Sequence, residues 1–186
     1  GIMVLLPAQI DRSSKLIQGI VLVIHGMMEY SQRYQSLCDR LVEQGLRVIV
    51  CDLPGHGPQA DALGHVPSQS GWSEWLTPYQ NALSTCHREN PDLPLFLLGH
   101  SMGSYLAQYL AADYGHMLSG LILSGTSYVP PLVAHVGRRL SAFLYPQEKA
   151  VATWIHRLTF LGFQRRISSP KTPYDWLSTD ADSVTS

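Results

Sequence analysis

Charged residues, cysteines and long apolar runs are all scarce in this sequence. Asp, Glu, Lys and Arg make up 15% of the 186 residues, and the formal net charge is −1. A protein that coats phosphate backbones carries an excess of basic side chains, so we expect no nucleic-acid partner. The three cysteines, Cys38, Cys51 and Cys86, show no paired spacing. This argues against a disulfide framework and favours a reducing, cytoplasmic location.

The sequence instead alternates short apolar runs with stretches of helical periodicity. Such alternation is typical of parallel strands joined by crossover helices, which makes the predicted fold class α/β. The expected strands cover residues 19–25, 46–51, 93–98 and 118–124. Helical patterns lie between them. The candidate N-cap of the first helix is Ser31, and Gly45 is expected just past its end. The second helix is expected to be capped at Ser73 or at Thr77, with Pro78 then in its first turn.

The pattern changes after Gly125. Pro130-Pro131 interrupts the chain, apolar residues then recur at helical spacing over 132–144 and 151–161, and residues 168–186 are irregular. No further strand-like run follows. We therefore expect residues 1–128 to form a core with a parallel sheet and residues 129–186 to form a helical region.

One apolar strand runs directly into the sequence Gly99-His100-Ser101-Met102-Gly103, and a helical pattern follows. A serine on such a strand-to-helix turn adopts strained backbone geometry, and the flanking glycines relieve the crowding around it. The free N–H groups of the following helix point to the place where negative charge would develop on an attacked carbonyl. The pattern predicts that Ser101 is a catalytic nucleophile, rather than part of a glycine-bracketed turn with no catalytic role.

A second motif, His25-Gly26-Met27-Met28-Glu29, follows the first expected strand. In an α/β-hydrolase the loop at this point brings one backbone N–H to the oxyanion, and the residue after the nucleophile brings the other. We therefore predict that Met27 and Met102 form an oxyanion hole through their main chains. We expect supporting roles for His25, Gly26, Glu29, Gly99, His100 and Gly103.

These segments together resemble the α/β-hydrolase branch that holds monoacylglycerol lipases, bacterial lysophospholipases and serine aminopeptidase-like hydrolases. The resemblance rests on residues 25–34, on Asp52-Leu53-Pro54-Gly55-His56-Gly57 and on residues 99–103, and it covers about residues 20–125. Residues 173–178, Pro-Tyr-Asp-Trp-Leu-Ser, resemble a cap segment of the bacterial members. The resemblance implies a serine ester hydrolase that needs no cofactor and no metal. It also implies a monoacyl lipid ester as substrate and a helical cap formed by residues 129–186.

The catalytic acid and histidine of this fold follow the serine, on loops after later strands. The expected strands end near Gly125, so we expect that these two residues are absent and that the chain is a fragment, nearly inactive by itself. Asp113 and His116 are predicted at the opposite edge of the sheet from Ser101. The remaining candidates fall in the expected cap: His135, His156, Asp175, Asp180 and Asp182.

Three other polar residues allow more than one interpretation. His100 is expected to pack below the turn rather than act as a base, because adjacent residues at a strand end point in opposite directions. Glu29 either orients the loop that contains Met27 or is solvated. His56, with Asp52, is expected to contribute loop polarity rather than a metal site, because the spacing fits no tight set of ligands.

Other functions remain open at this stage. The same scaffold carries peptidases and acyltransferases, and a catalytically silent hydrolase could act as a binding module. Trp154, Phe160, Leu161 and Phe163 could contact an acyl chain or transiently a membrane surface, although apolar stripes of this kind usually belong to the core. The sequence carries no signal for an oligomeric state.

Overall fold

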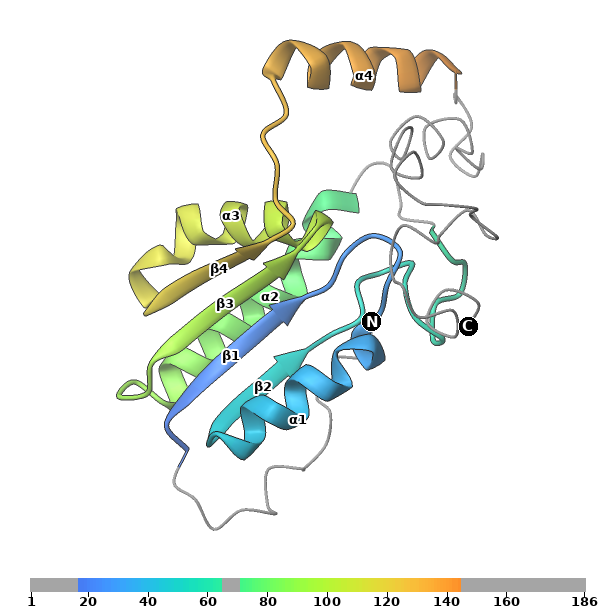
Figure 1. Cartoon of the computed structure of the whole chain (residues 1–186). Helices are drawn as coiled ribbons and strands as arrows, with labels where there is room; N and C mark the ends of the chain where they lie inside the picture. Colours follow the sequence, from blue (N-terminus) through green and yellow to red (C-terminus); the bar gives the residue numbers. More distant parts are fainter. Residues whose placement is uncertain (1–16, 65–70, 145–186) are drawn as a thin grey trace, which may run out of the picture. The chain divides into compact units, whose positions relative to one another are not determined.

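The computed structural model describes residues 17–64 and 71–144, and side chains as far as Arg139. The chain divides into two compact units, Gly1–Tyr128 and Val129–Ser186. In the described part of the first unit, four parallel strands form one sheet in the order β2-β1-β3-β4 (Figure 1). Their bounds are Gly19–Ile24 for β1, Leu46–Val50 for β2, Leu95–His100 for β3 and Gly120–Ser124 for β4. The predicted α/β class and the four predicted strands are confirmed.

Helices cover the two faces of this sheet (Figure 1). Helix α1 (Gln35–Glu43) packs on one face, where Cys38 and Tyr34 join Val21, Val23 and Val50 in a small core. Helices α2 (Gly71–Glu89) and α3 (Met102–Tyr114) pack on the other face and enclose the larger core around Leu22, Leu97 and Leu106. Strand β1 is buried along its whole length, as its continuous run of apolar residues predicts for a central parallel strand.

Tyr79 ties α2 to the sheet from within the core. Its side chain is fully buried, and its hydroxyl oxygen lies 2.9 Å from the Val23 carbonyl oxygen and 3.0 Å from that of Cys51, so the two carbonyls share its single proton. The Cys51 amide also donates to this hydroxyl, at 3.4 Å. The ends of β1 and β2 and the middle of α2 are thereby held at one point, directly beneath the loops that follow these strands.

The predicted helix starts are wrong. Ser31 lies inside a short 3₁₀ helix, Ser31–Tyr34, that leads into α1, and its amide donates to Asp52 Oδ1 at 2.6 Å. The side chain of a distant residue thus replaces the local cap. Helix α2 begins at Gly71, so Pro78 lies within the helix rather than in its first turn. Thr77 makes a bond inside the helix, from its hydroxyl to the Ser73 carbonyl.

Two strand boundaries also differ from the prediction. Strand β3 extends through His100, two residues beyond its apolar run, because main-chain pairing with β4 continues to Ser124. Strand β4 begins at Gly120, after a 3₁₀ turn at Gly115–Met117. Polar residues at the end of a strand are thus kept in the strand by main-chain hydrogen bonds to the neighbouring strand rather than by burial.

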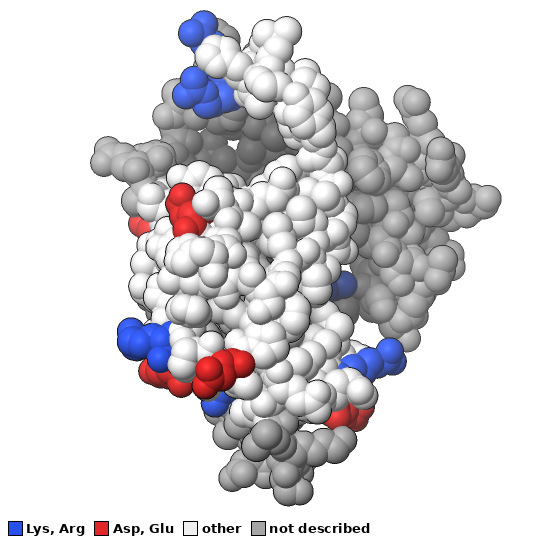
Figure 2. Space-filling model, turned by 90° about the vertical axis from the view of Figure 1, so that its left-hand side faces the viewer, with Lys and Arg blue, Asp and Glu red and all other residues white. Residues whose placement is uncertain are grey.

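Charge is sparse along the second half of the described chain. Between residues 93 and 137, Asp113 is the only Asp, Glu, Lys or Arg. Figure 2 shows mostly uncharged surface on the face that it draws. Within this stretch, Leu121 and Ile122 of β4 are substantially exposed.

The second unit is described only through α4 (Pro131–Leu144). This helix confirms the helical periodicity predicted for residues 132–144, and Leu132, Val133 and Val136 are exposed on it. The second predicted helix and the Pro-Tyr-Asp-Trp-Leu-Ser segment lie outside the described residues. Among the helices that the structure describes, none is long and apolar enough to cross a membrane.

Candidate active site

Ser101 occupies a sharp turn between the end of β3 and the start of α3. Its φ of 51° and ψ of −119° make it the only non-glycine residue with positive φ in the described chain. A side chain in this region of backbone space is strained by about 1–3 kcal/mol, and the surrounding structure must hold it there. The strained backbone predicted for Ser101 is therefore present, and the side chain is exposed.

The glycines on either side of Ser101 allow two backbones to meet. A Cβ on Gly103 would lie 2.6 Å from the His25 carbonyl oxygen and closer still to that of Ile24. A Cβ on Gly99 would lie 2.8 Å from the Ala107 Cβ. Only glycine fits these positions, and it allows the first turn of α3 to lie directly against the end of β1.

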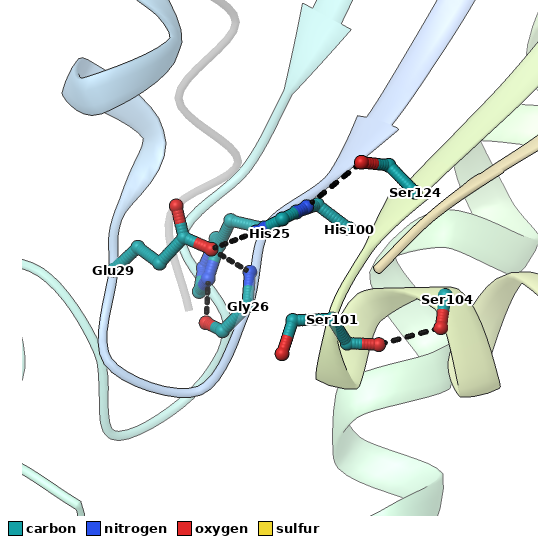
Figure 3. A network of polar contacts seen from close by, with 7 residues as sticks. All are labelled: His25, Gly26, Glu29, His100, Ser101, Ser104 and Ser124. Atoms are coloured by element: carbon teal, nitrogen blue, oxygen red, sulfur yellow. Dashed lines mark hydrogen bonds and ion pairs between the residues drawn. The ribbon is translucent and has the colours of Figure 1, made fainter. Parts of the chain in front are cut away.

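Hydrogen bonds fix the main chain of Ser101 and leave its hydroxyl free. The Ser101 amide donates to the Ser124 carbonyl at 2.8 Å, which links the turn to the end of β4. The Ser101 carbonyl accepts from the Ser104 amide at 2.9 Å and from the Ser104 hydroxyl at 2.6 Å (Figure 3). Within the described residues the Ser101 hydroxyl has no hydrogen-bond partner, and Figure 3 shows it on the side that faces Gly26.

The loop after β1, residues 25–30, lies against this turn and is called the β1 loop below. The ideal Cβ position of Gly26 is 3.2 Å from the Ser101 Cβ. The Gly26 amide donates to Glu29 Oε1 at 3.0 Å, and the Gly26 carbonyl accepts from His25 Nδ1 at 2.7 Å. The C=O and N–H of a trans peptide point in opposite directions, so fixing the Gly26 carbonyl also fixes the direction of the Met27 N–H.

The hydrogen bonds of His25 determine its tautomer. The Leu53 amide donates to His25 Nε2 at 2.9 Å, so this nitrogen carries a lone pair and the proton lies on Nδ1, which faces the Gly26 carbonyl. The side chain is fully buried. Burial lowers the pKa of His25 below its usual 6.5, and this outweighs the opposing effect of the Gly26 carbonyl. His25 is therefore held neutral, in the tautomer that orients the β1 loop.

Two amides beside Ser101 are left without acceptors. Neither the Met27 nor the Met102 main-chain N–H donates to any group in the part of the chain that the structure describes. Met102 is the first residue of α3, where the helix dipole places partial positive charge. Neither amide is therefore committed to a hydrogen bond within the described part of the chain.

Glu29 and His100 form a polar bridge above the turn. Glu29 Oε1 lies 3.6 Å from His100 Nε2, and His100 Nδ1 lies 3.1 Å from the Ser124 hydroxyl (Figure 3). The side chain of His100 is 40% exposed, so the prediction that it packs below the turn is wrong. Because β3 is paired with β4 up to this residue, the His100 ring lies next to polar partners. Of the two interpretations of Glu29, the structure favours the one in which it holds the β1 loop.

Sequence reasoning missed the contacts made by the loop after β2, residues 51–57, called the β2 loop below. His56 is buried and bonds to the Met27 carbonyl at 2.6 Å and the Pro54 carbonyl at 3.1 Å. Trp75 of α2 donates its indole N–H to the same Pro54 carbonyl at 3.0 Å. The Asp-Leu-Pro-Gly-His-Gly motif indicated a loop at this edge, but no feature of the motif predicted that His56 would bond to the Met27 carbonyl.

Two of the other candidates, Asp113 and His116, lie away from Ser101. Asp113 is twelve residues along α3, which at the rise of an α-helix places it about 18 Å away, and His116 follows it. His135 belongs to the second unit, and the other residues of the expected cap lie outside the described chain. No group of three His, Cys, Asp or Glu in the described ranges could hold a metal ion.

The chain is similar to known proteins both in sequence and in fold. The family model described as serine aminopeptidase, S33, matches residues 16–186. Phospholipase YtpA of Bacillus subtilis is 34% identical over 106 residues, which are 56% of this chain and 39% of that protein. A monoacylglycerol lipase of Mycolicibacterium smegmatis is 31% identical over 120 residues, which are 64% of this chain and 40% of that protein. The chain thus spans about two fifths of the length of these curated relatives.

Among solved structures, a thermostable carboxyl esterase from Bacillus coagulans, in complex with glycerol, is similar with a TM-score of 0.78 and 34% identity. The match covers 92% of this chain and 56% of the esterase. The chain belongs to the serine aminopeptidase, S33, family of α/β-hydrolases.

Proposed function

We propose that the protein is a serine carboxylic-ester hydrolase that acts on monoacyl lipids through an acyl-enzyme on Ser101. One observation carries this proposal. The exposed hydroxyl of Ser101 stands on a strained turn beside two main-chain amides, of Met27 and Met102, that have no acceptor among the described residues. This is the arrangement that acyl transfer requires of a nucleophile and an oxyanion hole.

The reaction follows from the roles of these groups. Ser101 Oγ attacks the ester carbonyl carbon and gives its proton to a general base, while the carbonyl oxygen becomes an oxyanion that accepts from the Met27 and Met102 amides. Collapse of the intermediate expels the alcohol and leaves the acyl group on Ser101, and water then releases the fatty acid. The described residues place no base against the Ser101 hydroxyl, so the reaction needs a base from outside the described part.

The proposed substrate class rests on the relatives. Two of them are named a phospholipase and a monoacylglycerol lipase, and the similar esterase structure contains glycerol. We therefore favour a lysophospholipid or a monoacylglycerol. We also propose that residues 129–186 form a helical cap that makes transient contact with a membrane surface, because α4 exposes Leu132, Val133 and Val136. The three unpaired thiols among the described residues support the cytoplasmic location.

Labelling with a fluorophosphonate probe tests the nucleophile. We expect mass spectrometry of the full-length protein to find the label on Ser101 and no label in the Ser101→Ala variant. Ser73→Ala removes an exposed serine of α2 and serves as the matched control, which should label like the parent. Labelling that survives in Ser101→Ala would contradict the assignment of the nucleophile. Absence of labelling from the full-length parent would contradict the proposal and favour a silent binding module.

A peptidase is the second candidate, because the matching family model is described as a serine aminopeptidase. A panel of monoacylglycerols, lysophospholipids and aminoacyl amides separates the two candidates. Faster turnover of the monoacyl esters supports the lipid hydrolase, whereas faster turnover of the amides supports the peptidase. Transfer of the acyl group to an added alcohol in preference to water would indicate an acyltransferase.

A further inference from the structure

His56 is buried between the two loops that follow β1 and β2, and main-chain carbonyls face both of its ring nitrogens. Nε2 lies 2.6 Å from the Met27 carbonyl oxygen, and Nδ1 lies 3.1 Å from that of Pro54. A carbonyl oxygen can only accept a hydrogen bond, so each contact needs a proton on the nitrogen that makes it. A neutral imidazole carries one such proton, and an imidazolium carries two. The surroundings of His56 therefore match the doubly protonated ring.

The neighbouring His25 shows the opposite arrangement. Its ring centroid lies 5.2 Å from that of His56, but its Nε2 accepts from the Leu53 amide while its Nδ1 donates to the Gly26 carbonyl. One donor and one acceptor suit a neutral ring. Of the two adjacent histidines, only His56 has partners that favour a positive charge.

The charges around the pair agree with this assignment. Asp52, on the β2 loop, and Glu29, on the β1 loop, are carboxylates whose electrostatic effect reaches His25. The third element, α2, contributes the uncharged Trp75, whose ring meets His56 edge-on at 5.8 Å, with Glu74 next to it in the chain. Two acids, Asp52 and Glu29, thus act on His25 beside His56, and negative charge in this region favours a cation over a neutral ring.

The two carbonyls depend on His56 to different degrees. The Pro54 carbonyl also accepts from the Trp75 indole, whereas the Met27 carbonyl has no other donor in the described residues. The 2.6 Å separation at Met27 is shorter than that of an ordinary N–H···O hydrogen bond, and charge on the donor shortens such bonds. Loss of one proton would leave a nitrogen lone pair facing a carbonyl oxygen, and the bridge between the two loops would loosen.

We propose that His56 is a positioning residue that acts as an imidazolium bridge between Met27 and Pro54, so that the alignment of the Met27 amide depends on pH. This inference rests on the proposed function, because it concerns the regulation of the same site. The β1 loop is held at the Gly26 carbonyl by a histidine whose partners suit the neutral ring, and at the Met27 carbonyl by one whose partners suit the imidazolium.

The first test needs no catalysis. Nitrogen-15 NMR of labelled histidines in the Ser101→Ala variant distinguishes the imidazolium from the neutral tautomers. We expect both nitrogens of His56 to be protonated wherever the bridge between Met27 and Pro54 is intact, and a pH series tests whether loss of one of these protons loosens it. The Met27 amide resonance should shift in parallel. A neutral His56 throughout the pH series, or a Met27 amide that does not follow it, would overturn the proposal.

The second test uses variants. His56→Gln keeps one N–H donor and carries no charge, and His87→Gln replaces an exposed histidine of α2 as the matched control. We expect the pH-dependent shift of the Met27 amide to disappear in His56→Gln and to persist in His87→Gln. In the full-length protein, the rate of Ser101 labelling relative to His56→Gln should fall severalfold as the pH rises. A ratio that stays constant with pH would contradict the role of the charge, whereas absence of labelling at every pH would count against the proposed function alone.

Discussion

Replacement of Gly103 by alanine should destabilise the protein more than any other single methyl group added to α3. The added Cβ would lie 2.6 Å from the His25 carbonyl oxygen and closer still to that of Ile24, whereas ordinary contacts begin at 3.4 Å. A displacement of roughly 0.8 Å is needed at the longer of these contacts, and both oxygens belong to the main chain at the end of β1 rather than to a side chain that can rotate. We expect a loss of about 3 kcal/mol in the free energy of unfolding.

Gly115→Ala, at the other end of the same helix, is the matched control. An added Cβ there meets nothing within 4 Å, and the φ of −57° suits any residue. Alanine at this position should stabilise the protein by about 0.4–1 kcal/mol through the unfolded state. Urea unfolding followed by circular dichroism measures both variants. Substitutions at the surface usually change the free energy of unfolding by less than about 0.5 kcal/mol. If the value for Gly103→Ala lies within that range of the parent, the close approach of α3 to β1 is wrong.

Three further predictions concern the core and the turn. Tyr79→Phe removes the hydroxyl that links the Val23 and Cys51 carbonyls, so urea unfolding should show a loss of about 1–3 kcal/mol, and no loss would mean that these carbonyls are satisfied elsewhere. Ser101→Gly should be more stable than Ser101→Ala by about 1 kcal/mol in the same assay, because only glycine relieves the strain of a positive φ, and equal stabilities would refute the strain. The pKa of His25 is lowered from 6.5, so the folded state binds fewer protons than the unfolded state below that pH. The stabilisation that neutral His25 contributes is therefore complete above pH 6.5 and is lost as the pH falls through the lowered pKa. The free energy of unfolding, measured at a series of pH values, should fall with pH in this way in the parent and less steeply in His25→Asn.

Local sequence patterns predicted most of the scaffold. The apolar run at 19–25 and the Gly-x-Ser-x-Gly segment each encode their own conformation, because burial on both faces and a strained turn leave signatures within a few residues. Position Gly45, predicted just past the first helix, indeed has a φ of +83° after α1. Helix starts could not be predicted in this way, because the amide of Ser31 is satisfied by Asp52, a residue 21 positions away.

Around Ser101, residue types were predictable and most of their contacts were not. The sequence named His25, Glu29 and His100 as supporting residues, but it placed His100 in the packed interior. The ring instead meets Glu29 and the Ser124 hydroxyl, because β4 pairs with β3 to its last residue.

The sequence by itself determined the class of fold, the turn that presents Ser101 and the two loops beside it, since each depends on neighbours along the chain. Only the tertiary structure decided how those loops hold one another. His25 meets Leu53 and His56 meets Met27 across 28 and 29 residues, because β1 and β2 are adjacent parallel strands whose ends lie at one edge of the sheet. The tautomer of one histidine and the charge proposed for the other follow from partners that no local pattern specifies.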